Sequence, residues 1–150
     1  MTKPYTPAIT PDPAALFGIP QGLARVPQGA QYTANTATTA ATPTAASVIG
    51  AQFTVLDMTG TLGAGVALTM PTVAVLLAAD TNAFDGKSYK LRVINTSSAN
   101  FAWTVSTATG WTLTGTMSIA QNTYRDFVVT ITSVGAATAT CQACGVGTQS

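Results

Sequence analysis

This sequence has very little charge and lacks the residue that enzymes use most often for proton transfer. Charged residues make up 7% of its 150 positions, and histidine and glutamate are absent. In ordinary globular domains, about a quarter of the residues are charged. Without histidine the chain cannot build the usual Ser-His or Cys-His nucleophile pair. A net charge of +1 offers no basic patch for nucleic acid. We therefore expect no enzyme, no cofactor and no nucleic-acid partner.

The few carboxylates are dispersed along the chain, at Asp12, Asp57, Asp80, Asp85 and Asp126. A carboxylate pair for glycoside hydrolysis would have to come from distant strands, and nothing in the spacing favours one. Asp80, Asn82 and Asp85 offer oxygen ligands for calcium. They do not match an EF-hand loop, however, and the chemistry of a turn explains them better.

Cysteine is scarce as well, because Cys141 and Cys144 are the only two. A zinc site needs two further Cys or His ligands, which only a second copy of the chain would supply. Side chains three positions apart on a strand point to opposite faces, which disfavours a disulfide between them. We therefore expect two small free thiols.

Long apolar runs are missing too. The most apolar stretch, Gly63–Ala79, is interrupted by polar residues and proline, and it is shorter than the about 20 residues that cross a bilayer. The first 30 residues hold most of the prolines and lack the unbroken apolar core of a secretory signal. We expect a protein made in the cytoplasm, without a membrane partner.

What the chain does have is strand periodicity. Apolar and polar residues alternate in Ser88–Asn95, Phe101–Ser106 and Thr123–Ser133, which is typical of half-buried strands. Weaker strand patterns occur in five further stretches, so that strands recur at intervals of about 8–12 residues. These stretches are Gln52–Met58, Val66–Met70, Trp111–Leu113, Met117–Ile119 and Ala137–Cys144. The sequence therefore predicts an all-β fold, an antiparallel β-sandwich. A jelly-roll order is preferred to an immunoglobulin-like one.

One short helix interrupts the strands. Pro71 precedes Thr72–Ala79, a run without helix breakers that we expect to plug one end of the sheet core. Near the start of the domain, Tyr32–Ser47 is rich in Ala and Thr and predicts a strand, a linker or both in succession. The domain is expected to cover residues 32–150.

Residues 1–31 are expected to form an extended, proline-rich arm, because prolines at this density exclude a regular helix or a central strand. The arm is too apolar for a solvated tail. Two interpretations stay open, an arm laid on a neighbouring subunit and an arm wrapped around its own domain. The candidate contact residues are Tyr5, Ile9, Leu16, Phe17, Ile19, Leu23, Arg25 and Val26.

The densest charge in the chain is the basic cluster of Lys87, Lys90 and Arg92. Lys90 and Arg92 share one face of a strand, and Asp126 or Asp57 is expected to lie across from them. The simpler interpretation is an exposed cross-strand pair, worth well under about 1 kcal/mol. The alternative is a salt bridge between subunits.

Three stretches carry a resemblance to a known family. Gly110–Ser133 resembles the C-terminal half of the small head decoration (cement) proteins of tailed bacteriophages, and Leu68–Ala79 with Tyr89–Thr96 resembles their upstream part. The resemblance covers about residues 50–140 and includes no catalytic motif. It implies a β-sandwich or jelly-roll domain on the outer capsid surface, a trimer or dimer, and arms that grip the major capsid protein.

The expected function is therefore that of a non-enzymatic virion structural protein, made in the host cytoplasm, that clamps neighbouring capsid subunits. Low charge gives little repulsion between molecules in solution, so it is more typical of a subunit in an assembly than of a free monomer at high concentration. The alternative is a head-fibre or tail-associated module that binds host glycans through Trp103, Trp111 or Tyr124. Aromatic residues at alternating strand positions, however, are more often core. A bacterial surface subunit is a third option.

Overall fold

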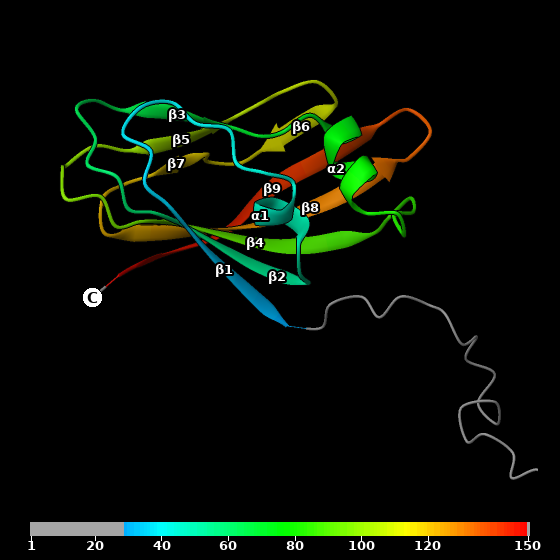
Figure 1. Ribbon diagram of the computed structural model, residues 1–150, viewed down its shortest axis with the longest axis horizontal. Coiled ribbons are helices and arrows are strands. Elements are labelled where there is room, and N and C mark those ends of the chain that lie inside the picture. Colours follow the sequence, from blue (N-terminus) through cyan, green and yellow to red (C-terminus); the bar gives the residue numbers. More distant parts are fainter. Residues whose placement is uncertain (1–28, 150) are drawn as a thin grey trace, which may run out of the picture.

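The computed structural model describes residues 29–149, which form two sheets and two short helices (Figure 1). The large sheet has six strands in the order β1-β2-β4-β8-β9-β6, and the small sheet has three in the order β3-β5-β7. The elements are β1 (Ala30–Asn35), α1 (Ala46–Ile49), β2 (Phe53–Met58), β3 (Val66–Thr69), α2 (Val73–Ala79), β4 (Ser88–Asn95), β5 (Trp103–Ser106), β6 (Trp111–Thr114), β7 (Ser118–Ile119), β8 (Thr123–Ser133) and β9 (Thr138–Thr148).

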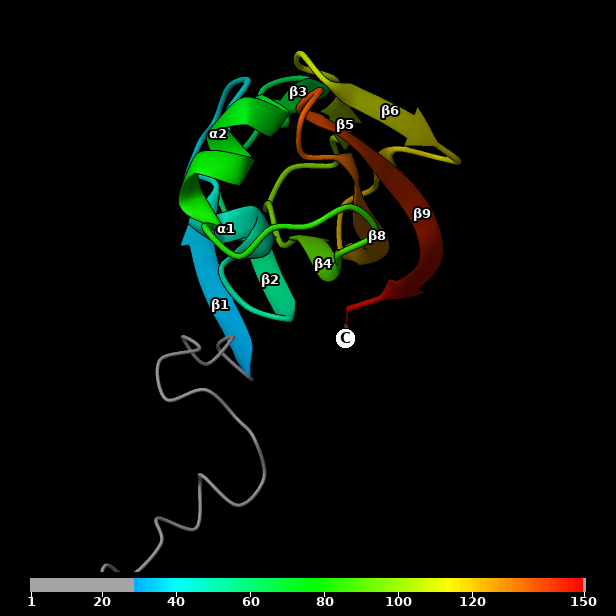
Figure 2. The same cartoon turned by 90° about the vertical axis from the view of Figure 1, so that its right-hand side faces the viewer.

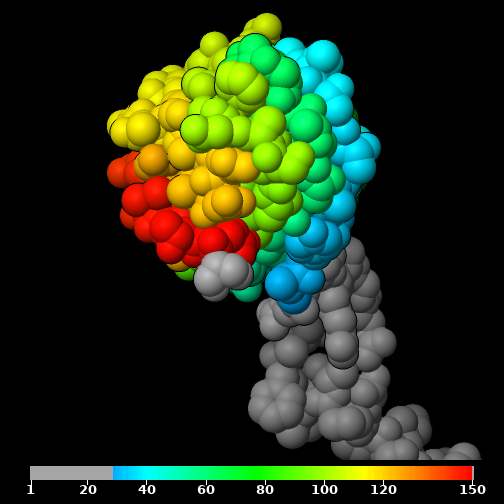
Figure 3. Space-filling model, turned by 90° about the vertical axis from the view of Figure 1, so that its left-hand side faces the viewer, coloured from blue at the N-terminus to red at the C-terminus, as the bar shows by residue number. Residues whose placement is uncertain are grey.

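The two sheets face each other across one apolar core. The large sheet curls around the core, and the small sheet lies opposite its middle strands (Figures 1 and 2). Leu91 and Phe127 of the large sheet and Leu68, Trp103 and Ile119 of the small sheet are almost completely buried in the same cluster. Figure 3 shows one end of this body, where green and yellow segments fill the space between β1 in blue and β9 in red.

The all-β prediction is confirmed, but uniformly antiparallel pairing is wrong. Four strand pairs are parallel, namely β1–β2, β2–β4, β3–β5 and β6–β9. The other three pairs in the described part of the chain, β4–β8, β5–β7 and β8–β9, are antiparallel. A jelly roll is built from antiparallel strands, so the parallel pairs also depart from that expectation. Alternation of side chains is the same in both kinds of pair, which is why periodicity did not reveal the direction.

The parallel pairs have a physical consequence for the path of the chain. Parallel neighbours cannot be joined by a tight hairpin and need a crossover connection. The crossover from β1 to β2 contains α1, and the crossover from β2 to β4 contains β3 and α2. Figures 1 and 2 show that these segments all lie on the same side of the large sheet.

The predicted helix is present as α2, and α1 is a second helix that the sequence did not indicate. Thr72 caps α2 by accepting a hydrogen bond from the Val75 amide, and Val73 and Leu76 are buried at one end of the core. Helix α1 has only four residues, and its Ala- and Thr-rich surroundings carry no helical periodicity. Within residues 29–149, no helix is long and apolar enough to span a bilayer.

The boundary predicted at Tyr32 falls inside β1. This strand begins at Ala30, so that Ala30 and Gln31 belong to the large sheet and not to an arm. The rest of the predicted arm lies outside the described residues. Strand β1 is at the edge of the large sheet, and residues 1–28 therefore join the domain at its periphery.

Candidate functional site

The large sheet has a second face, which points away from the core and which we call the outer sheet face. On β2, the side chains of Thr54, Leu56 and Met58 are buried, so the alternate residues point outward. The register of the strands places the following residues together on the outer sheet face: Tyr32, Phe53, Val55, Asp57, Lys90, Arg92, Ile94, Tyr124, Asp126 and Val128. Both helices and the small sheet lie on the opposite side (Figures 1 and 2).

Arg92 is the centre of the outer sheet face. Its Nε and Nη2 atoms donate hydrogen bonds to the two carboxylate oxygens of Asp126, at 2.6 and 2.8 Å. The guanidinium carbon lies 4.0 Å from the centre of the Tyr124 ring and 5.6 Å from that of Phe53. The hydrogen bonds to Asp126 raise the pKa of Arg92 above its usual value. The cation is therefore neutralised by a carboxylate and flanked by two rings.

A second carboxylate of this face is also satisfied by its neighbours. Asp57 is buried and accepts a hydrogen bond of 2.6 Å from the Tyr32 hydroxyl and one of 2.7 Å from the Thr96 hydroxyl. The bond to Asp57 raises the pKa of Tyr32, which keeps the phenol a donor. Both Asp57 and Asp126 thus accept hydrogen bonds from side chains of the same domain.

Tyr124 has room on this face because its neighbour on β9 has no side chain. Tyr124 is paired with Gly147, and a β-carbon on Gly147 would collide with the Tyr124 ring and hydroxyl. Gly145 is paired with Asp126, but a β-carbon there would lie 3.7 Å from the carboxylate, an ordinary contact distance. Gly147 is therefore the glycine that lets the Tyr124 side chain extend over β9.

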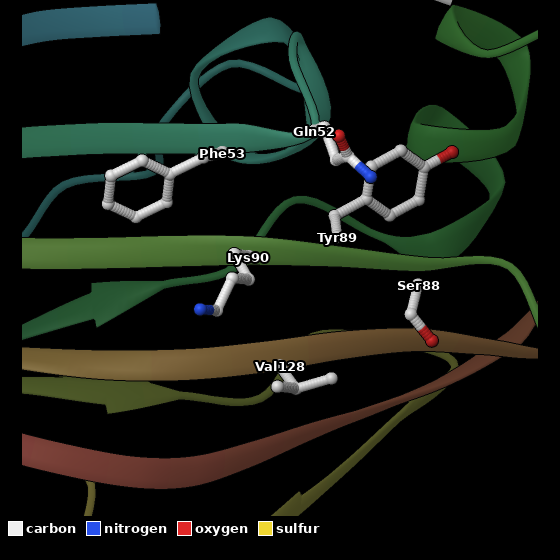
Figure 4. Close-up of a pocket in the computed structure, with 6 residues that line it drawn as sticks. All are labelled: Gln52, Phe53, Ser88, Tyr89, Lys90 and Val128. Atoms are coloured by element: carbon white, nitrogen blue, oxygen red, sulfur yellow. The ribbon is translucent and has the colours of Figure 1, made fainter. Parts of the chain in front are cut away.

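An open pocket of about 380 Å³ marks one end of the outer sheet face (Figure 4). Phe53, Lys90 and Val128 form one row across β2, β4 and β8, and Figure 4 shows Lys90 between the other two. Gln52, Ser88 and Tyr89 complete the lining. The register pairs Phe53 with Ala30 on β1, so the pocket lies near the point where residues 1–28 join the domain.

The groups on this face are suited to contact with a binding partner. The outer sheet face combines three aromatic rings with aliphatic side chains, and its two carboxylates are already hydrogen-bonded. Within residues 29–149, no group of three or more Cys or Asp side chains is arranged to hold a metal ion. Such a surface suits an apolar partner with few charges.

The structure places the two predicted basic residues on this face. Arg92 lies opposite Asp126, one of the two carboxylates predicted for it, and the pair is within one chain. Asp57, the other candidate, lies on the adjacent strand β2, two residues beyond Val55, which is the register partner of Arg92. Lys90 is exposed and lines the pocket. All the predicted arm contacts lie outside the described residues, namely Tyr5, Ile9, Leu16, Phe17, Ile19, Leu23, Arg25 and Val26.

The tryptophans are core residues. Trp103 is fully buried and Trp111 is 8% exposed, and the Trp111 indole donates a hydrogen bond of 2.7 Å to the Pro71 carbonyl. Neither ring is available to a sugar at the surface. Of the three aromatics considered for glycan binding, only Tyr124 lies on the outer sheet face.

The cysteines are free, as expected. Cys141 is buried and Cys144 is exposed, in agreement with their positions three residues apart on β9. Burial, and secondly the charge of Cys144, raises the pKa of the Cys141 thiol to about 12. The exposed Cys144 is therefore the thiol that reagents can reach.

The aspartates of the turn after α2 accept hydrogen bonds from other residues of the domain. Asp80 pairs with Lys87 at 2.6 Å, accepts a hydrogen bond from the Tyr89 hydroxyl, and accepts another from the Asn82 amide. Asp85 accepts a hydrogen bond of 2.7 Å from the Val134 amide. The turn interpretation of these aspartates is supported, since their oxygens are used within the protein.

Sequence reasoning missed the outer sheet face as a unit, although a signal for it was present. Strand β2 carries apolar residues at both alternating sets of positions, Phe53 and Val55 as well as Leu56 and Met58. A sheet with one solvated face needs only one such set.

Comparison of the chain with family models, with curated proteins and with solved structures returned no match.

We predict that the Arg92–Asp126 pair contributes little to folding stability. The two side chains are 31% and 27% exposed, and exposed ion pairs are worth about 0.2–1 kcal/mol. A double-mutant cycle with Arg92→Met and Asp126→Asn, followed by urea denaturation, measures the coupling. A coupling energy above about 3 kcal/mol, the range of buried pairs, would contradict the description of this pair as a surface feature.

Asp80 is predicted to make folding stability fall at acid pH. Burial raises the pKa of Asp80, but the hydrogen bonds from Lys87 and Tyr89 outweigh burial and leave it below the usual value. The stabilisation is therefore present at neutral pH and is lost as the pH falls from about 4 through the lower pKa of the folded state. Asp80→Asn should cost about 1–3 kcal/mol at neutral pH, and this difference should shrink in acid.

Urea denaturation of the unmodified protein and of Asp80→Asn, at neutral and at acid pH, measures the difference between their free energies of unfolding. Lys87→Met is the matched variant, because it removes the ion pair from the other side and should lose part of the same acid sensitivity. A difference between Asp80→Asn and the unmodified protein that stays constant down to about pH 2 would refute the assignment.

Proposed function

We propose that this protein is a non-enzymatic virion structural protein that binds the outside of a bacteriophage capsid and stabilises it. In this proposal it clamps neighbouring subunits of the major capsid protein and acts as a homo-oligomer, a trimer or dimer. The resemblance of Gly110–Ser133 to head decoration proteins motivates the proposal. The two facing sheets are compatible with the β-sandwich that the resemblance implies, with mixed strand directions.

The observation that carries the proposal is the place where the N-terminal segment joins the domain. Residues 1–28 precede β1, which is an edge strand, and a segment that starts at the edge can leave its own domain without unfolding it. Twenty-eight residues span at most about 95 Å when fully extended. That reach is sufficient for contact with a neighbouring capsid subunit.

The stabilising mechanism is linkage. A protein that binds only the assembled shell shifts the equilibrium away from disassembly. Several arms on one oligomer bind with a raised effective concentration, so that weak individual contacts add up to lasting attachment. Low charge on the domain also limits the desolvation cost of laying it on another protein. The buried Trp103 and Trp111 give no support to the alternative, glycan recognition through these rings.

Deletion of residues 1–28 is predicted to leave a folded domain that no longer binds capsids. The deletion ends before β1 because Ala30 and Gln31 pair with β2. Circular dichroism checks the fold, and co-sedimentation with capsids that lack the protein measures binding. Light scattering of the full-length protein gives the oligomer mass.

A pair of full-length variants controls for the length of the arm. Leu16→Ser, Phe17→Ser and Ile19→Ser together should weaken co-sedimentation at least tenfold, whereas Thr6→Ser, Thr10→Ser and Gln21→Ser together should leave it unchanged. Capsid binding at full strength by the deleted protein would refute the role of the arm. A full-length protein that ignores capsids altogether would refute the proposed function.

A further inference from the structure

No helix or strand of residues 29–149 lies over the outer sheet face (Figures 1 and 2). Tyr32 is 62% exposed, and Phe53, Val55 and Val128 are half-buried. The charged groups of the same face, apart from Lys90, are paired within the domain. Contiguous apolar patches on a surface mark interaction sites.

A segment of suitable composition begins beside this face. Residues 14–28 directly precede the described domain and contain Leu16, Phe17, Ile19, Leu23 and Val26 together with Pro20 and Pro27. They join the domain immediately before Ala30, which is paired with Phe53 of the pocket. The first described residues after the segment are therefore close to the pocket.

The distances to be covered are short. From β1 to β8 there are three strand spacings, which amount to about 14 Å. Fifteen residues in an extended polyproline conformation span about 45 Å. The segment is long enough to cross the whole outer sheet face, and residues 1–13 are left over for other contacts.

The chemistry of the pocket suits such a segment. Grooves lined by aromatic rings bind proline-rich extended chains, because these chains lose little entropy when they are ordered. Phe53, Val128 and the aliphatic part of Lys90 offer an apolar row. A tethered segment also has an effective concentration in the range of about 1 mM, so even weak docking within one chain is well populated.

We propose that residues 14–28 dock on the outer sheet face of their own chain in the free protein, with apolar side chains of the segment on the row of Phe53, Lys90 and Val128. This inference does not depend on capsid binding. It assigns the pocket to the protein's own N-terminal segment, and it leaves residues 1–13 as the part of the arm that extends furthest from the domain.

The native thiols permit a direct test on the full-length protein. Cys144 is exposed, and its Sγ lies 3.4 Å from the Asp126 carbonyl oxygen, close to the outer sheet face. Cys141 is buried and should not react. A nitroxide spin label on Cys144 of ¹⁵N-labelled protein therefore broadens the amide NMR signals of any segment that lies on this face.

The proposal predicts strong broadening for residues 16–26. Phe53→Asp should reduce this broadening at least twofold, whereas Phe84→Asp, at a ring that is 60% exposed but belongs to the loop after α2, should leave it unchanged. The amide spectrum of each variant reports at the same time whether the domain is folded. The measurement on the unmodified sequence decides the question even if a variant fails to fold.

Two results would overturn the proposal. The first is the absence of broadening in residues 16–26 of the labelled full-length chain. The second comes from a mixture of spin-labelled ¹⁴N protein with unlabelled ¹⁵N protein. Broadening of equal strength in that mixture would mean that the segment docks on a second copy and not on its own chain. Failure of capsid binding changes neither result.

Discussion

Three parallel neighbours, β1, β2 and β4, impose the constraint on which the rest of this structure depends. Parallel strands need crossovers, and here both crossovers pass over the same face of the large sheet with α1, β3 and α2. That face becomes the core, where the small sheet and the two helices meet Leu91 and Phe127. The opposite face receives no cover from residues 29–149. One sheet thus provides both the stability of the domain and its candidate binding surface.

Three of the four charged residues of the outer sheet face have partners within the domain, and this limits what the face can do. Arg92 is paired with Asp126 and flanked by two rings, and Asp57 is held by two hydroxyl groups. Burial of these three residues against another protein would leave none of their charges unpaired. Lys90 of the same face is exposed, and its aliphatic chain can contact a partner while its ammonium group stays in water. A face that is rich in aromatic rings and balanced in charge is therefore suited to assembly.

Much of the fold was predictable from local pattern, and the rest depended on information that local pattern does not contain. Alternation located Ser88–Asn95 and Thr123–Ser133 as strands with the observed bounds, and the run after Pro71 gave α2. The same alternation cannot distinguish parallel from antiparallel neighbours, since direction is set by long-range crossovers. The partner of Arg92 was narrowed to two carboxylates, and only the register of β4 on β8 chose Asp126. The outer sheet face emerged only once the strand order was known.

We infer that the outer sheet face is a contact surface in the full-length protein. Hydroxyl-radical footprinting tests it with a matched pair of rings, because Tyr32 on this face and Phe84 outside it are 62% and 60% exposed in the described domain. After correction for the intrinsic reactivity of each ring, we expect at least threefold less labelling of Tyr32 than of Phe84 in the full-length protein, alone or on capsids. Equal labelling of the two rings in both states would show that nothing covers the outer sheet face, and it would refute a contact there.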